Sequence, residues 1–269
     1  MAVKKTPSHS PDHVEGVNPV LEALRGTREV YEVYVASQSL EPSAQLRKVI
    51  EMANAAGVPV KHVPRQRIES MATTAAPQGV IAAVAPYRYW DLPDIVRALE
   101  KVDRPLLLAL DGVEDPQNFG ALLRVADAAG VQAVIAPGRR SAGISAAVAK
   151  ASAGAVEHIT VIRISSLAAA IDRLKAAGFW IVGAEADEGV PYYEVDMTVP
   201  TVIVLGGEGK GLSRLVRERC DTLASLPMKG AVTSLNVAAA GAVLLSQAYD
   251  CDDAERFAID GRRRWRCSC

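Results

Sequence analysis

Two polar side chains interrupt an apolar segment near the end of the chain, where residues 233–248 read TSLNVAAAGAVLLSQA. The hydroxyl of Ser234 and the amide of Asn236 are groups that can bind a ligand or orient a reacting group. They also suit a helix N-cap, because their side-chain oxygens accept hydrogen bonds from the free N–H groups of the first turn. Residue types alone leave two interpretations: Thr233-Ser234 caps a buried helix, or Ser234 and Asn236 belong to a site.

A glycine-rich loop, VIVLGGEGKGLS (202–213), follows a predicted strand and places Glu208 among four glycines. A loop of this kind before a helix is a usual place for a ligand that touches backbone amides. The phosphate-loop pattern is absent, because it needs Gly where Val204 stands and Ser or Thr where Gly211 stands, and the dinucleotide pattern is absent because Leu212 takes the place of its third glycine. Glu208 either belongs to a site or stabilises the following helix through its charge.

A third polar stretch, LDGVEDPQNFGALLRVADAAG (110–130), contains Arg124. Asp115-Pro116 is a typical helix start, with an N-cap followed by proline at the first helical position. Asn118 is compatible with a cap or turn. A helical wheel places Arg124 opposite the apolar face and beside small residues that would let another group approach closely, so Arg124 is either solvated or part of a site. The apolar face comprises Phe119, Leu122, Val125, Ala126 and Ala129, and the small residues are Gly120 and Ala121.

The three polar stretches follow strands of one predicted sheet. The segments LLLALDG, AVIAPG, HITVIRI, WIVGAE, TVIVLGG and TLASLP are nearly continuous apolar runs separated by helical patterns. Strands of this kind are buried on both faces, so residues 105–250 are predicted to form a doubly wound α/β domain with a parallel sheet. Ligands bind beyond the carboxyl ends of such strands, which is where the polar residues collect.

A smaller α/β domain is predicted for residues 13–85. Its strands are YEVYVA (31–36), VPVKHV (58–63) and GVIAAVA (79–85), and the segment SAQLRKVIEMANAAG between the first two has helical spacing. Residues 86–104 are predicted to be a linker with one short helix.

Composition indicates an ordinary globular protein. Of 269 residues, 49% are hydrophobic and 23% charged, and the net charge is −1, so a nucleic-acid partner would have to be bound by local basic patches. The four cysteines lack metal-ligand spacing, and the N-terminal lysines lack a following apolar core, so we expect a cytoplasmic protein without a signal peptide. We expect disorder at residues 1–12 and in the basic tail 251–269, which is either an RNA-touching arm or a frayed end.

Taken together, the polar stretches resemble the three motifs of the SpoU/TrmH family of RNA ribose 2'-O-methyltransferases, in the SPOUT superfamily. The matching segments are DPQNFGALLRVADAAGV, IVLGGEGKGLS and LPMKGAVTSLNVAAA. Two N-terminal segments, GVNPVLEALR and PQGVIAAV, resemble the substrate-binding domain of the 23S rRNA guanosine-2'-O branch. The resemblance covers roughly residues 13–250.

The resemblance implies a SPOUT-type parallel sheet with a C-terminal deep trefoil knot, preceded by a ribosomal-protein-L30e-like substrate-binding domain. It also implies S-adenosylmethionine as cofactor, no metal, and a homodimer. Carried over by motif position, the catalytic residues are Arg124, Asn118, Glu208, Ser234 and Asn236. The cofactor-binding residues carried over in the same way are Gly206, Gly207, Leu226, Met228 and Leu235.

The implied reaction is attack of a ribose 2'-hydroxyl on a sulfonium methyl carbon, which requires alignment and removal of a proton. Arg124 is the family's favoured base. Since an arginine pKa above about 12 makes deprotonation costly, gripping a phosphate is the alternative role.

A guanosine of 23S rRNA is the expected substrate. The alternatives are methylation of tRNA, methylation of an rRNA loop that confers antibiotic resistance, and a non-catalytic RNA-binding or ribosome-assembly role. A dehydrogenase is rejected because the glycine fingerprint is absent. Local basic residues predicted to contact RNA are Lys61, Arg65, Arg67 and Arg139, although the run KHVPRQR is equally compatible with a solvated face.

Overall fold

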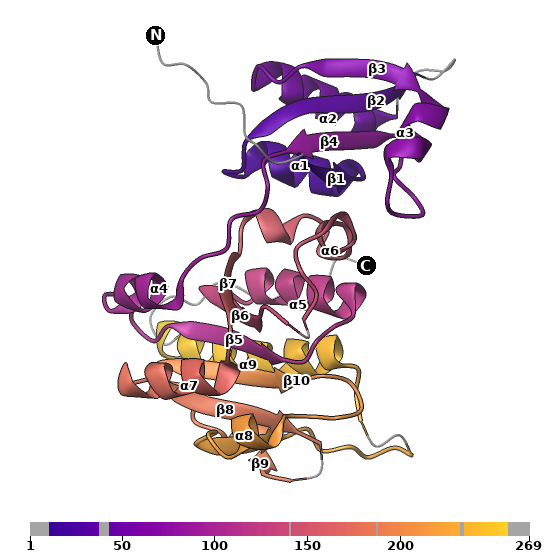
Figure 1. The fold of residues 1–269 in the computed structure, drawn as a ribbon. Helices are drawn as coiled ribbons and strands as arrows, with labels where there is room; N and C mark the ends of the chain where they lie inside the picture. Colours follow the sequence, from indigo (N-terminus) through magenta and orange to yellow (C-terminus); the bar gives the residue numbers. More distant parts are fainter. Residues whose placement is uncertain (1–10, 38–42, 140, 187, 232–233, 258–269) are drawn as a thin grey trace. The chain divides into compact units, whose positions relative to one another are not determined.

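The computed structural model describes residues 11–37, 43–139, 141–186, 188–231 and 234–257. The chain divides into two compact units, each assembled from several stretches of sequence. Figure 1 labels the helices and strands along the chain. The first comprises Met1–Trp90, Val113–Asp127 and Arg140–Thr160, and the second comprises Asp91–Gly112, Ala128–Arg139 and Val161–Cys269. Part of the stretch predicted to form the larger domain therefore groups with the N-terminal residues.

A four-stranded sheet of order β1-β4-β2-β3 is the centre of the first unit. β4 pairs antiparallel with β1 and β2, whereas β2 and β3 are parallel. The strands are β1 (Asp12–Glu15), β2 (Val30–Ser37), β3 (Val60–Pro64) and β4 (Val80–Val84), and the helices are α1 (Val17–Arg25), α2 (Ala44–Ala55), α3 (Arg65–Met71), α5 (Pro116–Ala128), α6 (Ala146–Ala151) and the 3-10 turn η1 (Ala155–Glu157).

The three strands and the helix predicted for residues 13–85 are confirmed as β2, β3, β4 and α2. The strand β1 and the helices α1 and α3 were not predicted. α3 buries Ile68 alone, so a segment of seven residues shows little helical periodicity. β1 begins at Asp12, one residue inside the stretch expected to be disordered, and residues 1–10 lie outside the described residues.

A buried carboxylate fixes β1 to the loop that precedes β4. Glu15 accepts hydrogen bonds from the backbone N–H groups and the hydroxyls of Thr73 and Thr74, over distances of 2.5 to 3.0 Å. Burial alone would raise the pKa of Glu15, but these hydrogen bonds outweigh burial and lower the pKa. The carboxylate is therefore held in its charged form in the interior of the first unit.

The second unit is built on a seven-stranded sheet of order β7-β6-β5-β10-β8-β11-β9. Every pair whose register is described is parallel, which confirms the predicted parallel sheet. The strands are β5 (Leu106–Asp111), β6 (Ala133–Pro137), β7 (Thr160–Ile164), β8 (Trp180–Glu185), β9 (Val190–Pro191), β10 (Thr201–Gly206) and β11 (Thr222–Ser225). All of these except the two-residue β9 were predicted.

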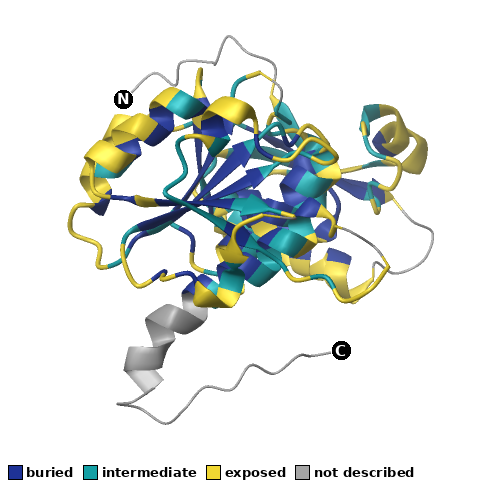
Figure 2. Cartoon of the chain, turned by 90° about the horizontal axis from the view of Figure 1, so that it is seen from below, coloured by how far each residue is buried: buried dark blue, intermediate teal, exposed yellow. Residues whose placement is uncertain are grey.

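Helices of the second unit bury the apolar strands. They are α4 (Leu92–Leu99), α7 (Leu167–Ala176), α8 (Arg214–Arg217) and α9 (Val237–Phe257), with the 3-10 turn η2 (Tyr192–Glu194). The first three share one hydrophobic core with β5, β6, β8 and β10, while α9 contacts β10. Figure 2 shows the strands largely buried and the outer sides of the helices exposed. The one short helix predicted for the linker is confirmed as α4.

The last helix is longer than predicted. α9 continues to Phe257, so residues 251–257, which were expected to be disordered, are helical, and residues 258–269 of the predicted tail lie outside the described residues. The last turns continue the hydrogen bonding of a helix that begins at Val237. Within the described residues, no helix is long and apolar enough to cross a membrane.

Candidate active site

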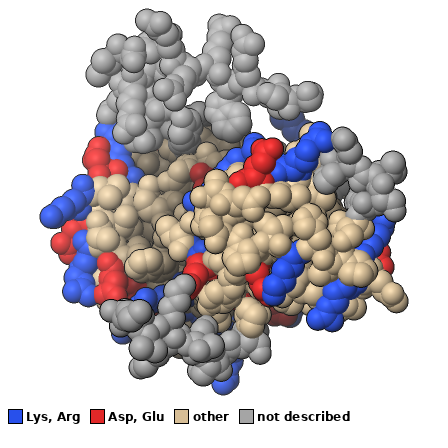
Figure 3. All heavy atoms as spheres, turned by 90° about the horizontal axis from the view of Figure 1, so that it is seen from above, with Lys and Arg blue, Asp and Glu red and all other residues tan. Residues whose placement is uncertain are grey.

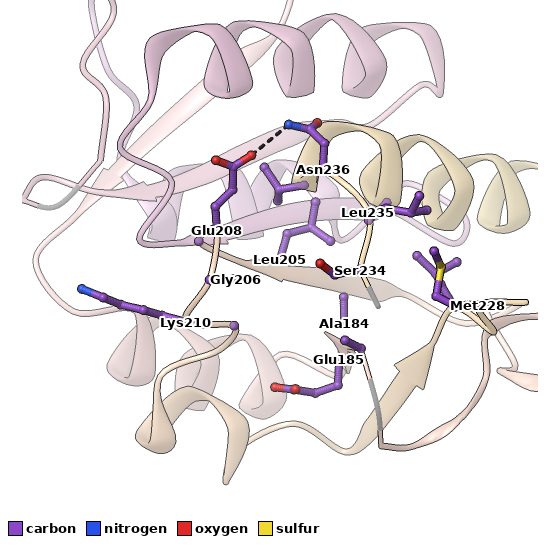
Figure 4. A pocket seen from close by; sticks show the side chains of 17 residues that line it. Ala184, Glu185, Leu205, Gly206, Glu208, Lys210, Met228, Ser234, Leu235 and Asn236 are labelled. Atoms are coloured by element: carbon purple, nitrogen blue, oxygen red, sulfur yellow. Dashed lines mark hydrogen bonds between the residues drawn. The ribbon is translucent and has the colours of Figure 1, made fainter. Parts of the chain in front are cut away.

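A cavity of about 580 Å³ opens at the carboxyl ends of the strands of the second unit (Figure 4). Three segments line it: residues 184–186 at the end of β8, residues 205–211 at the end of β10 and in the glycine loop, and residues between 226 and 240 that lead into α9. The location is the one predicted from the arrangement of parallel strands.

The glycine loop is clamped to the end of β5. Asp111 accepts a hydrogen bond from Gly207 N at its backbone oxygen (2.8 Å) and one from Ser213 N at its carboxylate (2.7 Å). A Cβ on Gly206 would lie 2.2 Å from the backbone carbon of Gly211, and one on Gly207 would lie 2.3 Å from the backbone oxygen of Gly112. These contacts with rigid backbone are what require glycine at both positions.

Glu208 and Asn236 meet at the edge of the cavity. The Asn236 side-chain nitrogen donates a hydrogen bond to a Glu208 carboxylate oxygen over 2.9 Å, and both residues are exposed (Figure 4). The structure therefore joins the glycine loop to the start of α9, which are separated by 28 residues in the sequence.

Asn236 is the N-cap of α9. Its side-chain oxygen accepts hydrogen bonds from Ala238 N (2.9 Å) and Ala239 N (3.4 Å). Of the two interpretations left by the sequence, the one in which Thr233-Ser234 caps this helix is wrong, because the helix starts at Val237 and Ser234 is three residues before it. Ser234 instead lines the cavity, while Thr233 lies outside the described residues.

The sequence-predicted cofactor residues are brought together in this cavity. Apolar side chains from β10 and from the segment before α9 form much of its wall, and the backbone of the glycine loop forms another part. The residues shared between prediction and cavity are Gly206, Gly207, Leu226, Met228 and Leu235, together with the catalytic candidates Glu208, Ser234 and Asn236.

Two charged residues that line the cavity were not predicted from the sequence. Glu185 is the last residue of β8, and Lys210 lies in the glycine loop. The signal for Glu185 was available, since a carboxylate that ends a buried parallel strand stands where ligands bind. Its carboxylate lies 3.8 Å from the guanidinium of Arg217.

The other two catalytic candidates, Asn118 and Arg124, lie on α5 in the first unit. Asp115 caps this helix as predicted, since its carboxylate accepts a hydrogen bond from Asn118 N over 2.8 Å. Arg124 is exposed, in agreement with its predicted position opposite the apolar face of the helix. Gly120 is buried, and a Cβ there would lie 2.5 Å from the Cβ of Ala151, so the group that approaches this small residue is helix α6.

The predicted RNA-contacting side chains are on the surface, and two of them have acidic neighbours. Lys61 forms an ion pair with Glu32, and Arg65 pairs with Glu69 over 3.0 Å. Arg67 is exposed on α3, and Arg139 is exposed in the second unit. On the face drawn in Figure 3, Lys and Arg side chains are interspersed with Asp and Glu.

The thiol of Cys220 offers little chemistry. Burial, followed by the charge of Asp221, raises the pKa of the Cys220 thiol to about 11, so this cysteine is a poor nucleophile at neutral pH. Among the described residues, no group of three or more His, Cys, Asp and Glu side chains is placed to hold a metal ion.

Comparison with known proteins gives two family matches, one in the C-terminal part of the chain and one in the N-terminal part. Residues 105–246 match the model of the SpoU rRNA Methylase family, and residues 13–90 match the model for RNA 2'-O ribose methyltransferase substrate binding.

Individual relatives cover nearly the whole chain. A putative TrmH family tRNA/rRNA methyltransferase, YacO of Bacillus subtilis, is 42% identical, over 90% of this chain and 96% of its own. The 23S rRNA (guanosine-2'-O-)-methyltransferase RlmB of Pseudomonas aeruginosa is also 42% identical, over 87% of this chain and 94% of its own. The crystal structure of an rRNA methyltransferase from Sinorhizobium meliloti with bound S-adenosylmethionine has a TM-score of 0.73 and 28% identity, covering 89% of this chain and 87% of that one.

Proposed function

Since the chain belongs to the SpoU rRNA Methylase family, we propose that it methylates the ribose 2'-hydroxyl of a guanosine in 23S rRNA. Membership of the family makes the protein an RNA 2'-O-methyltransferase that depends on S-adenosylmethionine. The proposal adds the identity of the RNA and of the nucleotide, and the roles of individual residues.

The cavity beside the Glu208–Asn236 pair is the observation that carries the proposal. Its volume of about 580 Å³ suits a ligand of the size of S-adenosylmethionine, and its lining combines apolar side chains with the glycine loop. We assign Leu226, Met228 and Leu235 to the walls around the adenosine and methionine parts. Bound S-adenosylmethionine supplies a methyl group already activated by the positive charge on sulfur.

The residues at the edge of the cavity would position the RNA. Glu208 and Asn236 orient one another through their 2.9 Å hydrogen bond, and Ser234 presents a hydroxyl in the preceding segment. We also assign Asn118 and Arg124 to catalysis, by their place in the family motif. For Arg124 we favour a grip on an RNA phosphate, because its guanidinium holds a proton too firmly to act easily as a base.

Ribosomal RNA is favoured over tRNA for two reasons. A substrate-binding stretch matches residues 13–90, and the Pseudomonas relative is named for a 23S rRNA guanosine. The Bacillus relative is named for tRNA or rRNA, so tRNA is the alternative substrate. An rRNA substrate also agrees with the expectation of a cytoplasmic enzyme.

Three further features follow from the family relationship as proposals. The C-terminal segment forms a trefoil knot, the N-terminal stretch is a domain like ribosomal protein L30e, and two copies of the chain form a homodimer. The non-consecutive order of strands β10, β8 and β11 is compatible with a knotted connection. Light scattering in solution would test the dimer directly, with a monomeric mass contradicting it.

Methyl transfer tests the proposed function most directly. Labelled S-adenosylmethionine is incubated with the protein and with unmodified 23S rRNA or tRNA in parallel. We expect label in 23S rRNA at a guanosine whose neighbouring phosphodiester resists alkaline cleavage, because a methylated 2'-oxygen cannot attack it. Label in tRNA alone would replace the proposed substrate with the alternative, and the absence of both transfer and cofactor binding would contradict the activity.

A further inference from the structure

Glu185 is a charged residue of the cavity to which the proposed chemistry gives no role. It ends β8 at the carboxyl edge of the sheet and lines the cavity together with Ala184 and Ala186. In Figure 4 it lies across the cavity from Glu208 and Asn236. Glu185 is therefore remote from the edge where we place the RNA hydroxyl.

The surroundings of Glu185 hold its carboxylate beside the glycine loop. Its side chain is 21% exposed, and one carboxylate oxygen lies 3.8 Å from Nε of Arg217. The two carboxylate oxygens would be 3.6 and 3.8 Å from a Cβ built on Gly211, which is ordinary contact distance. Arg217 offsets the negative charge, while the cavity side of the carboxylate remains available to a ligand.

A carboxylate at this place can accept hydrogen bonds from two neighbouring hydroxyl groups. Because its two oxygens accept hydrogen bonds in parallel, it matches the vicinal 2'- and 3'-hydroxyls of a ribose. An acidic residue beyond a parallel strand serves a ribose in this way in dinucleotide-binding folds, although the glycine pattern of those folds is absent from this chain. The ribose also lies between the adenine and the sulfur, away from the methyl group that must face the RNA.

We propose that Glu185 binds the ribose hydroxyls of S-adenosylmethionine and selects a cofactor that carries both. This inference rests on the proposed placement of the cofactor in the cavity. It makes Glu185 a binding residue for the cofactor, with no contact to the RNA hydroxyl.

Glu188 provides a matched control. Its carboxylate also pairs with Arg217, but it is 69% exposed and is not among the residues that line the cavity. Glu185→Gln and Glu188→Gln therefore each remove one negative charge beside the same arginine, and Glu185→Gln alone changes the cavity wall. Thermal unfolding of both variants verifies that they remain folded.

The test measures the binding of S-adenosylhomocysteine and of its 2'-deoxy and 3'-deoxy forms by calorimetry, without RNA. For Glu185→Gln we expect about tenfold weaker binding or more, the usual scale for hydrogen bonds to a charged group. Removing a ribose hydroxyl should weaken binding to the wild type but have much less effect on Glu185→Gln. The KM for S-adenosylmethionine should rise while kcat is retained, and Glu188→Gln should match the wild type.

Two outcomes overturn the inference. Equal sensitivity of the wild type and Glu185→Gln to loss of the ribose hydroxyls would show that the carboxylate does not bind them. Unchanged binding of 5'-methylthioadenosine to Glu185→Gln, combined with weaker binding of S-adenosylhomocysteine, would assign the carboxylate to the amino-acid end of the cofactor. Failure of the wild type to bind any of these ligands would instead contradict the placement of the cofactor in the cavity.

Discussion

Asn236 uses the two ends of one amide for two different tasks. The side-chain oxygen caps α9 by accepting hydrogen bonds from Ala238 N and Ala239 N, while the nitrogen donates to Glu208. The N-terminus of α9 and the orientation of Glu208 are therefore coupled through a single side chain. Substitutions that keep one end of the amide separate the two tasks.

Asn236→Asp keeps the capping oxygen and replaces the donor to Glu208 with a second carboxylate oxygen. We expect the free energy of unfolding to stay within about 0.5 kcal/mol of the wild type, since aspartate caps as well as asparagine, whereas Asn236→Ala should lower it by about 1 kcal/mol. Both variants should lower the rate of RNA methylation by about tenfold or more, because Glu208 loses the hydrogen bond from Asn236. Denaturant unfolding and single-turnover methyl transfer measure the two effects.

Ser166→Ala is the control for the capping effect, because Ser166 caps α7 in the same unit through Ala169 N. It should lower stability by about 1 kcal/mol and leave methyl transfer unchanged. A normal methylation rate in Asn236→Asp would show that the Glu208 contact has no part in the reaction.

Arg124 is the residue for which the sequence leaves two roles, base or phosphate clamp. Arg124→Ala should lower turnover by about 10²-fold or more, within the range for one acid–base or charge-stabilising group, while the affinity for S-adenosylmethionine is retained. Arg124→Lys keeps the positive charge without the bidentate fork, so partial recovery indicates charge stabilisation, and no recovery indicates a bidentate grip. Turnover at the wild-type rate in Arg124→Ala would remove this residue from the mechanism.

At the scale of elements, the glycine loop depends on close approach of backbone to backbone. Gly206→Ala would place a Cβ 2.2 Å from the backbone of Gly211, which the loop can relieve only by moving. We expect S-adenosylhomocysteine to bind about tenfold more weakly or worse, with a loss of about 1–3 kcal/mol in stability from overpacking. Calorimetry and thermal unfolding measure these changes.

Gly230→Ala is the matched control in the next loop. A Cβ on this exposed glycine meets no atom of the described residues within 4 Å. Binding and stability should therefore stay close to wild-type values. If Gly206→Ala binds the cofactor as the wild type does, the tight geometry of the loop is unnecessary for the cavity.

The strands could be predicted because a buried parallel strand has a local sequence pattern, a short apolar run that ends at a polar residue. The N-cap of α9 has no such pattern. Ser234 and Asn236 are both good capping residues, and they lie two positions apart. Asn236, which caps the helix, also donates a hydrogen bond to Glu208, 28 residues away in the sequence. In the same way, the packing of Gly120 against Ala151 depends on a contact between helices, which local periodicity cannot predict.

For the whole molecule, a net charge of −1 means that attraction to RNA must come from local groups. The candidate groups on β3 and α3 are partly neutralised, since Lys61 pairs with Glu32 and Arg65 pairs with Glu69. Such exposed pairs are weak, so an RNA phosphate can replace the carboxylate of Glu69 at little cost. Arg65 and Arg67 therefore remain the best test of whether this surface binds RNA.

Charge reversal at both positions, Arg65→Glu with Arg67→Glu, should weaken RNA binding and flatten its salt dependence. Each phosphate contact to single-stranded RNA contributes about 0.7 to the slope of log K against log salt concentration, so losing two contacts should reduce that slope by about 1.4. Arg97→Glu with Lys101→Glu, on α4 and just after it, makes the same change in net charge on the second unit, whereas Arg65 and Arg67 belong to the first. Filter-binding titrations at several salt concentrations compare the two double variants, with cofactor affinity expected to be unchanged in both. An unaltered slope in the Arg65/Arg67 variant would place the RNA interface elsewhere, and equal losses in the two variants would attribute the effect to net charge alone.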